Sequence, residues 1–266
     1  MGLIYDRDFP AFKVLGNFYS VGNIAGSMHI LDTNDGLIVF DTGYIETFGL
    51  FIDRMWRFGL DPKNVIAIFI THGHVDHIGG AKKLREISGA KIYISRVDAP
   101  TARGEDQLSA DKMLGLKFTE FFTPDVLLED GDVFSLNGTD VRCMATPGHT
   151  AGAMSFFFDI SHNGRKYKTA IHGGAGILTM SKAYLNDYNL PFTLRDDFID
   201  AMNRLKDEEV DVYIGNHLEQ NNTAEKYEKL INGDELAFVN PDEWRAGCES
   251  CISALRNMIE KENNNG

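Results

Sequence analysis

Short runs of β-branched and aromatic residues alternate with turn-forming residues through the first third of the chain. These runs predict strands at 17–22, 27–33 and 36–43, with a hairpin turn in the segment DTNDG. An amphipathic segment at 45–58 stops at Gly59, which favours a helix with a glycine at its C-terminal end. The nearly continuous apolar run at 64–70 then predicts a strand that is buried on both faces.

The rest of the chain repeats this order of strands and helices. A helix at 78–88 and a strand at 90–95 precede residues 101–124, which carry no clear periodicity. The later predicted elements are strands at 131–136, 139–146, 152–160 and 166–173, a helix at 194–207, a strand at 210–215, and a helical C-terminal section with a frayed polar tail from about 262. This order predicts an α/β (α+β) fold, in which two sheets pack face to face with helices on their outer faces.

Composition narrows the class of protein. The chain has 266 residues and is 43% hydrophobic, and it contains no linker or repeat, so we expect a single domain spanning 1–266. With 26 Lys and Arg against 39 Asp and Glu, the net charge of -13 disfavours nucleic-acid partners and anionic membrane surfaces. No signal-peptide pattern precedes the first strand, which leads us to expect a cytoplasmic protein. Cys248 and Cys251 are expected to be reduced thiols on a helix, because no second pair stands near them to complete a zinc site.

The segment FITHGHVDHIGG (69–80) places four potential metal ligands directly after the buried strand. His72 and His74 are two residues apart, so their side chains point to the same side of an extended segment. Asp76 and His77 follow where the chain turns into the next helix. Four donors do not fit one ion that keeps an open coordination position, and they therefore favour two adjacent ions.

Two further histidines stand directly after predicted strands. His149 lies in TPGHTAG and His217 in VYIGNHLEQN. Loops at strand ends are where a rigid scaffold presents functional side chains. Either histidine taken alone is more often structural, so the cluster at 72–77 is what makes them candidate ligands.

His-x-His-x-Asp-His after a strand, Pro-Gly-His-Thr, and a late histidine after a strand together resemble the metallo-β-lactamase superfamily. The likeness runs from about Phe18 to the C-terminal helix. It is greatest to the β-lactamase subclass that has one three-histidine site and one Asp-His-His site. The resemblance implies a four-layer αββα sandwich with its active site at one edge of the two sheets.

The resemblance also implies a role for each candidate residue. His72, His74 and His149 would bind a first zinc ion, and Asp76, His77 and His217 a second, with a water or hydroxide between the ions. Asp76 and His217 would take part in catalysis as well as in metal binding. Asp41, in VFDTG, would support the ligands from behind. Two zinc ions are expected, with iron or manganese as open alternatives.

The chain departs from the enzymes that it resembles after Pro-Gly-His-Thr. Gly173 and Gly174 stand where glyoxalase II enzymes and lactonases carry a metal-bridging aspartate, and where the β-lactamases carry substrate-binding serines. His172, Gly173, Gly174 and Tyr184 are candidate pocket residues. His172 either faces the pocket or points elsewhere.

The resemblance therefore implies a metal-dependent hydrolase of a small molecule with an amide, lactam, lactone, ester or thioester bond, in which β-lactam turnover is a native or a weak activity. The alternative from another class is a non-catalytic metal-binding scaffold or sensor on the same fold. A phosphodiesterase is disfavoured by the acidic balance of the chain. The oligomeric state is left open.

Overall fold

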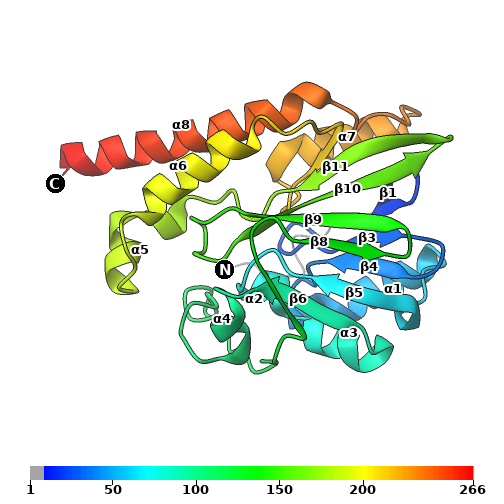
Figure 1. Cartoon of the computed structure of the whole chain (residues 1–266), viewed down its shortest axis with the longest axis horizontal. Helices are drawn as coiled ribbons and strands as arrows, with labels where there is room; N and C mark the ends of the chain where they lie inside the picture. Colours follow the sequence, from blue (N-terminus) through cyan, green and yellow to red (C-terminus); the bar gives the residue numbers. More distant parts are fainter. Residues whose placement is uncertain (1–8, 266) are drawn as a thin grey trace.

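A computed structural model describes residues 9–265, and its first layer of strands is a seven-stranded sheet (Figure 1). The strands lie side by side in chain order: β1 (Phe12–Leu15), β2 (Phe18–Ser20), β3 (His29–Asp32), β4 (Leu37–Phe40), β5 (Val65–Phe69), β6 (Lys91–Ser95) and β7 (Val126–Leu128). Neighbours from β1 to β4 are antiparallel, and those from β4 to β7 are parallel. The parallel half places the carboxyl ends of β4, β5 and β6 at one edge of the sheet.

The second sheet has five strands in the order β12-β11-β10-β9-β8. Their bounds are β8 (Val133–Leu136), β9 (Thr139–Ala145), β10 (Met154–His162), β11 (Arg165–Ile171) and β12 (Val212–Ile214). The strands β8 to β11 form an antiparallel meander, while β12 is parallel to β11. Asn163 and Gly164 make the tight turn between β10 and β11 with φ of 49° and 76°, which asparagine and glycine tolerate best.

Helices cover the outer face of each sheet. Figure 1 shows α1 and α3 beyond the first sheet, and α6 and α8 beyond the second. The α-helices are α1 (Phe48–Arg57), α2 (Val75–Ile78), α3 (Ala81–Ser88), α4 (Ala99–Arg103), α5 (Lys182–Asp187), α6 (Leu194–Leu205), α7 (Thr223–Ile231) and α8 (Pro241–Asn265). The described residues also form short 3-10 turns at η2 (Ile45–Thr47), η3 (Pro62–Asn64), η4 (Leu178–Met180) and η5 (Gln220–Asn222). The predicted four-layer sandwich in a single domain is confirmed.

Aromatic side chains fill the space between the two sheets. Phe40 of β4 stacks on Phe158 of β10 with ring centroids 4.6 Å apart, and Phe69 of β5 meets Phe156 edge to face at 5.4 Å. All four are buried. This packing joins the carboxyl end of β5 to β10, and so positions the segment that follows β5 against the second sheet.

Several elements differ from the sequence-based expectation. The strands β1 and β7 and the helix α4 were not predicted, and the predicted helix at 45–58 divides into η2 and α1. At the other end, α8 continues to Asn265, through the residues that we expected to be frayed. Cys248 and Cys251 both lie on α8 as free thiols, as expected. Within residues 9–265, no helix is both long and apolar enough to cross a bilayer.

Candidate metal centre

The candidate ligands meet at the edge of the sandwich where several strands end. The segment with His72, His74, Asp76 and His77 leaves β5 and turns into α2, while His149 follows β9 and His217 follows β12. The two sheets are joined directly at this edge. The amide of Met154, the first residue of β10, donates to the carbonyl of Thr71 at 2.8 Å.

The six side chains form two groups of three, and these match the two predicted ligand sets: His72, His74 and His149, and Asp76, His77 and His217. In each group the ligand atoms lie within 4.8 Å of one another. The three rings of the first group are evenly spaced, with each pair of centroids 4.7 Å apart. In the second group, Oδ2 of Asp76 lies 3.4 Å from Nε2 of His77 and 3.3 Å from Nε2 of His217.

Hydrogen bonds at the back of the rings orient their free nitrogens. The Thr71 hydroxyl donates to Oδ2 of Asp41 at 2.8 Å, and it therefore accepts from Nδ1 of His72 at 3.0 Å. Nδ1 of His149 donates to the carbonyl of Gly176 at 2.8 Å. Both rings thus keep an unprotonated Nε2. Nε2 of His72 is buried and has no hydrogen-bond partner among the residues described, which is the environment expected of a metal ligand.

The protonation states also fit a divalent cation. Burial, together with the neighbouring imidazoles, holds the pKa of His72 and of His74 well below the usual range, and burial lowers the pKa of His149 to about 4. Burial would raise the pKa of the Asp76 carboxyl, but the adjacent histidines hold it far below its usual range. Neutral imidazoles and an ionised carboxylate are the donors that zinc takes, so these four residues fit zinc. His77, whose pKa is raised by two neighbouring carboxylates, would complete a second zinc site with the release of its proton.

Asp41, the candidate supporting aspartate, lies directly behind the second group. Its Oδ2 accepts from Nδ1 of His77 at 2.7 Å, and its Oδ1 accepts from the Thr71 amide at 2.8 Å. Burial alone would lower the pKa of His77, but the carboxylates of Asp76 and Asp41 raise it to about 10. One carboxylate therefore orients both His77 and, through Thr71, His72.

The candidate pocket residues take different positions. Gly174 and Gly176 pack against the His149 ring, since a Cβ atom at either residue would lie 3.0 Å or less from it. The His172 ring is buried, with Nε2 3.2 Å from Sδ of Met202 and its centroid 5.9 Å from that of Trp244. Of the two alternatives for His172, this position favours the one in which the ring points elsewhere.

Gly173 and Tyr184 are the two remaining pocket candidates. The Gly173 amide donates to Oγ of Ser155 at 2.9 Å, beside the buried end of β10. Tyr184, on α5, stacks on Tyr188 with centroids 4.4 Å apart. Burial, with a contribution from Tyr188 and Asp106, raises the pKa of Tyr184 to about 12, so its hydroxyl stays protonated.

Sequence reasoning missed three polar residues that support the ligand segments: Thr71, His29 and Asp98. His29 is fully buried, and its Nε2 bonds the carbonyl of Gly215 at 3.0 Å, two residues before His217. Burial lowers the pKa of His29 to about 4, so this ring is neutral and donates. A signal was present for Asp98, which follows the buried strand β6 at the same sheet edge as the histidine cluster.

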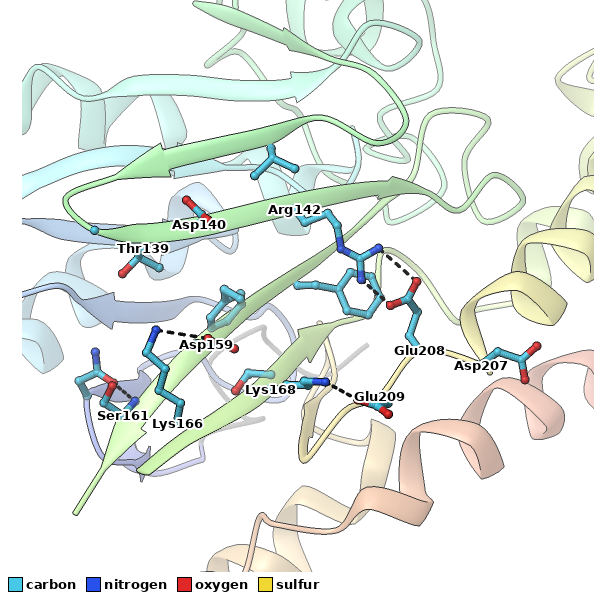
Figure 2. A pocket seen from close by; sticks show the side chains of 16 residues that line it. Thr139, Asp140, Arg142, Asp159, Ser161, Lys166, Lys168, Asp207, Glu208 and Glu209 are labelled. Carbon is cyan, nitrogen blue, oxygen red and sulfur yellow. Dashed lines mark hydrogen bonds and ion pairs between the residues drawn. The ribbon is translucent and has the colours of Figure 1, made fainter. Parts of the chain in front are cut away.

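A separate groove lies on the outer face of the second sheet (Figure 2). Its cations are already paired: Arg142 with Glu208, Lys168 with Glu209, and Lys166 with Asp159. None of the described residues that line it belongs to the two ligand groups. The groove therefore offers neither a metal site nor an unmatched positive charge, and the chemistry is concentrated at the sheet edge.

Curated relatives match part of the chain. A hydroxyacylglutathione hydrolase of Francisella tularensis subsp. novicida is 33% identical over 159 residues, which cover 59% of this chain and 52% of that protein. The probable polyketide biosynthesis zinc-dependent hydrolase BaeB of Bacillus velezensis is 33% identical over 91 residues, covering 34% of this chain and 33% of that protein. The chain thus spans about a third to a half of the length of these relatives.

Solved structures match over nearly the whole chain. The subclass B3 metallo-β-lactamase BJP-1 of Bradyrhizobium japonicum superposes with a TM-score of 0.86 and 23% identity, covering 97% of this chain and 96% of that one. FEZ-1 of Legionella gormanii superposes with a TM-score of 0.87 and 23% identity, covering 97% and 98%. At this identity the likeness shows the fold. The sequence profile of the metallo-beta-lactamase superfamily matches residues 21–162. Because that match covers more than half of the sequence, the chain belongs to the metallo-β-lactamase superfamily.

Proposed function

We propose that this chain is a dizinc hydrolase that cleaves an activated acyl bond (a lactam, lactone or thioester) in a small molecule. The observation that carries the proposal is the convergence of six donors, from loops of both sheets, into two groups of three. The buried and unpartnered Nε2 of His72 supports a bound cation, because a polar atom in such a position is costly unless something occupies its lone pair.

The histidines of the first group would bind the metal, and Asp76 would have a second role beside metal binding. Bound zinc would supply a nucleophile from water near neutral pH and positive charge opposite the developing oxyanion. The three histidines of the first group are neutral, so each would offer an imidazole nitrogen to the ion. Asp76 remains ionised beside His77 and His217, and its side chain is 12% exposed. We assign to this carboxylate the orientation of the attacking water, in addition to metal binding.

Two features bear on the substrate. Gly173 and Gly174 present neither a carboxylate nor a hydroxyl, so the substrate must be held by other groups than the serines of the β-lactamases. The net charge of -13 repels polyanions, which favours a small acyl compound over a nucleic acid. The relative named as a hydroxyacylglutathione hydrolase supports acyl-bond hydrolysis, and the one named as a zinc-dependent hydrolase supports zinc as the metal.

The test is zinc content together with turnover of a panel of chromogenic thioester, lactone, β-lactam and phosphodiester substrates. We expect two zinc ions per chain and turnover of at least one acyl substrate. The double variant His72→Ala, Asp76→Ala should lose zinc and at least about a hundredfold in kcat/KM, since it removes one ligand from each group. His162→Ala is the matched control, because this histidine lies in the β10–β11 hairpin and pairs with Glu235 at 3.6 Å.

Two results would contradict the proposal. Protein that is purified without a transition metal, and that does not take up zinc, would exclude a metal hydrolase. Protein that holds two zinc ions but turns over none of the four substrate classes would favour the non-catalytic scaffold or sensor.

A further inference from the structure

Asp98 connects the two ligand-bearing segments of the three-histidine group. Its Oδ2 accepts from the Gly73 amide at 2.9 Å, and Gly73 stands between His72 and His74. The same oxygen accepts from the hydroxyl of Thr150 at 2.7 Å, directly after His149. Its Oδ1 accepts from the Gly152 amide at 2.9 Å. One carboxylate thus binds the loop after β5 and the loop after β9.

Asp98 is buried, and a hydrogen bond holds its backbone in place. The residue is 4% exposed and stands at the N-terminus of α4, yet its carboxylate makes no capping bond to that helix. Its own amide donates to Oγ of Ser95 at 3.0 Å, which fixes the turn after β6. The carboxylate therefore accepts hydrogen bonds from two other segments of the chain and none from its own helix.

The opposing loop is shaped to meet this carboxylate. A Cβ atom on Gly152 would lie 2.4 Å from Oδ1 of Asp98 and 2.4 Å from Oγ of Ser95. A side chain at this position would force the loop away, so glycine is what allows the loop to approach. Charge-assisted hydrogen bonds of this kind are short and directional, and they restrain the backbone on both sides of each ligand.

We propose that Asp98 is a positioning residue for the three-histidine metal site, which it assembles by fixing the His72–His74 segment and the His149 segment relative to each other. This inference rests on the proposed metal-binding function. The second group has no bond to Asp98 among the contacts described, so the effect of Asp98 is specific to the first group. Partners behind metal ligands commonly change metal affinity by about 10- to 100-fold.

The decisive variant is Asp98→Asn, which keeps the size of the side chain. An amide offers one acceptor oxygen, and its NH₂ group faces a backbone N–H or the Thr150 hydroxyl instead of accepting from it. We expect zinc affinity at one of the two sites to fall by about tenfold or more, while the other site changes less than about threefold. Competition with a chromophoric chelator measures both affinities, and the visible spectrum of bound Co²⁺ reports the ligand geometry.

Asp125→Asn is the matched control. Oδ2 of Asp125 also accepts a backbone amide, that of Ile92 at 2.9 Å, but at the opposite end of β6. This variant is expected to lose stability without a change in zinc affinity. Equal effects of the two variants on zinc affinity would show that Asp98 acts only through general stability, which would overturn the inference.

Two variants of Thr150 test the role of Asp98 if Asp98→Asn does not fold. Thr150→Ser keeps the hydroxyl and should keep wild-type zinc affinity, whereas Thr150→Val removes the hydrogen bond to Asp98 and should weaken one site by about threefold or more. Wild-type affinity in Thr150→Val would contradict the inference. The two proposals fail separately: two bound zinc ions without turnover overturn the hydrolase and leave these affinities measurable, whereas unchanged affinities in an active enzyme overturn the role of Asp98 alone.

Discussion

His172 is a buried histidine whose two ring nitrogens are both engaged by the protein. Nδ1 accepts from the Gly174 amide at 3.0 Å, and Nε2 lies 3.2 Å from Sδ of Met202. Burial, with a smaller contribution from His149, lowers its pKa from 6.5 to about 4. The ring is therefore neutral in the folded protein at pH values where the unfolded chain already binds a proton.

This difference makes a prediction for stability against pH. A lowered folded-state pKa contributes stability that is complete above the unfolded pKa and is lost as pH falls through the folded pKa. From pH 7 to pH 4, zinc-free wild type should lose about 3 kcal/mol more unfolding free energy than His172→Asn. Asparagine does not titrate, and it can still accept from the Gly174 amide. Urea unfolding at each pH measures the difference, and parallel curves for the two proteins would show that His172 is not responsible.

At the scale of elements, the close approach of the segment after β11 to the first residue of β10 explains why a glycine stands at position 173. A Cβ atom there would lie 2.3 Å from the carbonyl oxygen of Met154 and 2.6 Å from Oγ1 of Thr146. The Met154 amide in turn bonds Thr71, next to His72. A residue larger than glycine would therefore push on the strand that supports the ligand segment.

Gly173→Ala should accordingly lower the unfolding free energy by about 1–3 kcal/mol, because backbone and buried side-chain atoms would have to move. Gly49→Ala is the control: nothing lies within 4 Å of its added Cβ, and alanine favours helix α1, so stability should be unchanged or higher by up to about 1 kcal/mol. Chemical unfolding of both variants tests this. Equal stability of Gly173→Ala and wild type would mean that β10 can move away without a loss of unfolding free energy. A metal-bridging aspartate at position 173 would then be sterically allowed.

Some elements and ligands of this protein could be predicted from the sequence, and others could not. The strand β5 and the ligands after it were predictable because the apolar run and the His-x-His-x-Asp-His spacing are both local. By contrast, β7 has three residues and α4 has five, too few for a periodic signal. The place of Asp98 after a strand could have marked it as a candidate, but its hydrogen bonds could not be predicted because its partners stand 25, 52 and 54 positions away along the chain. Bonds of this kind depend on how the two sheets pack, which no local pattern encodes.

At the scale of the whole molecule, the ligand groups join its two halves. His72 and His74 come from the loop after β5 in the first sheet, and Asp76 and His77 from α2, which follows it directly. His149 and His217 follow strands of the second sheet. Each group of three therefore contains two ligands from the first half and one from the second. A metal ion in either group would resist separation of the sheets, and the unfolded chain would lose this arrangement of donors.

Zinc should therefore stabilise the fold in addition to its role in the proposed hydrolysis. For a ligand that binds only the folded state, free zinc at 1,000 times the dissociation constant adds about 4 kcal/mol per site. The melting temperature of zinc-free protein should rise steadily with buffered free zinc. In the double variant His149→Ala, His217→Ala, which removes the second-half ligand from each group, the rise should be largely lost, while His162→Ala should behave as wild type. Calorimetry at a series of zinc concentrations measures the effect. A double variant that gained as much stability from zinc as wild type would show that the ion is held by the first half alone, because the four donors of the 72–77 segment would then suffice without the second sheet.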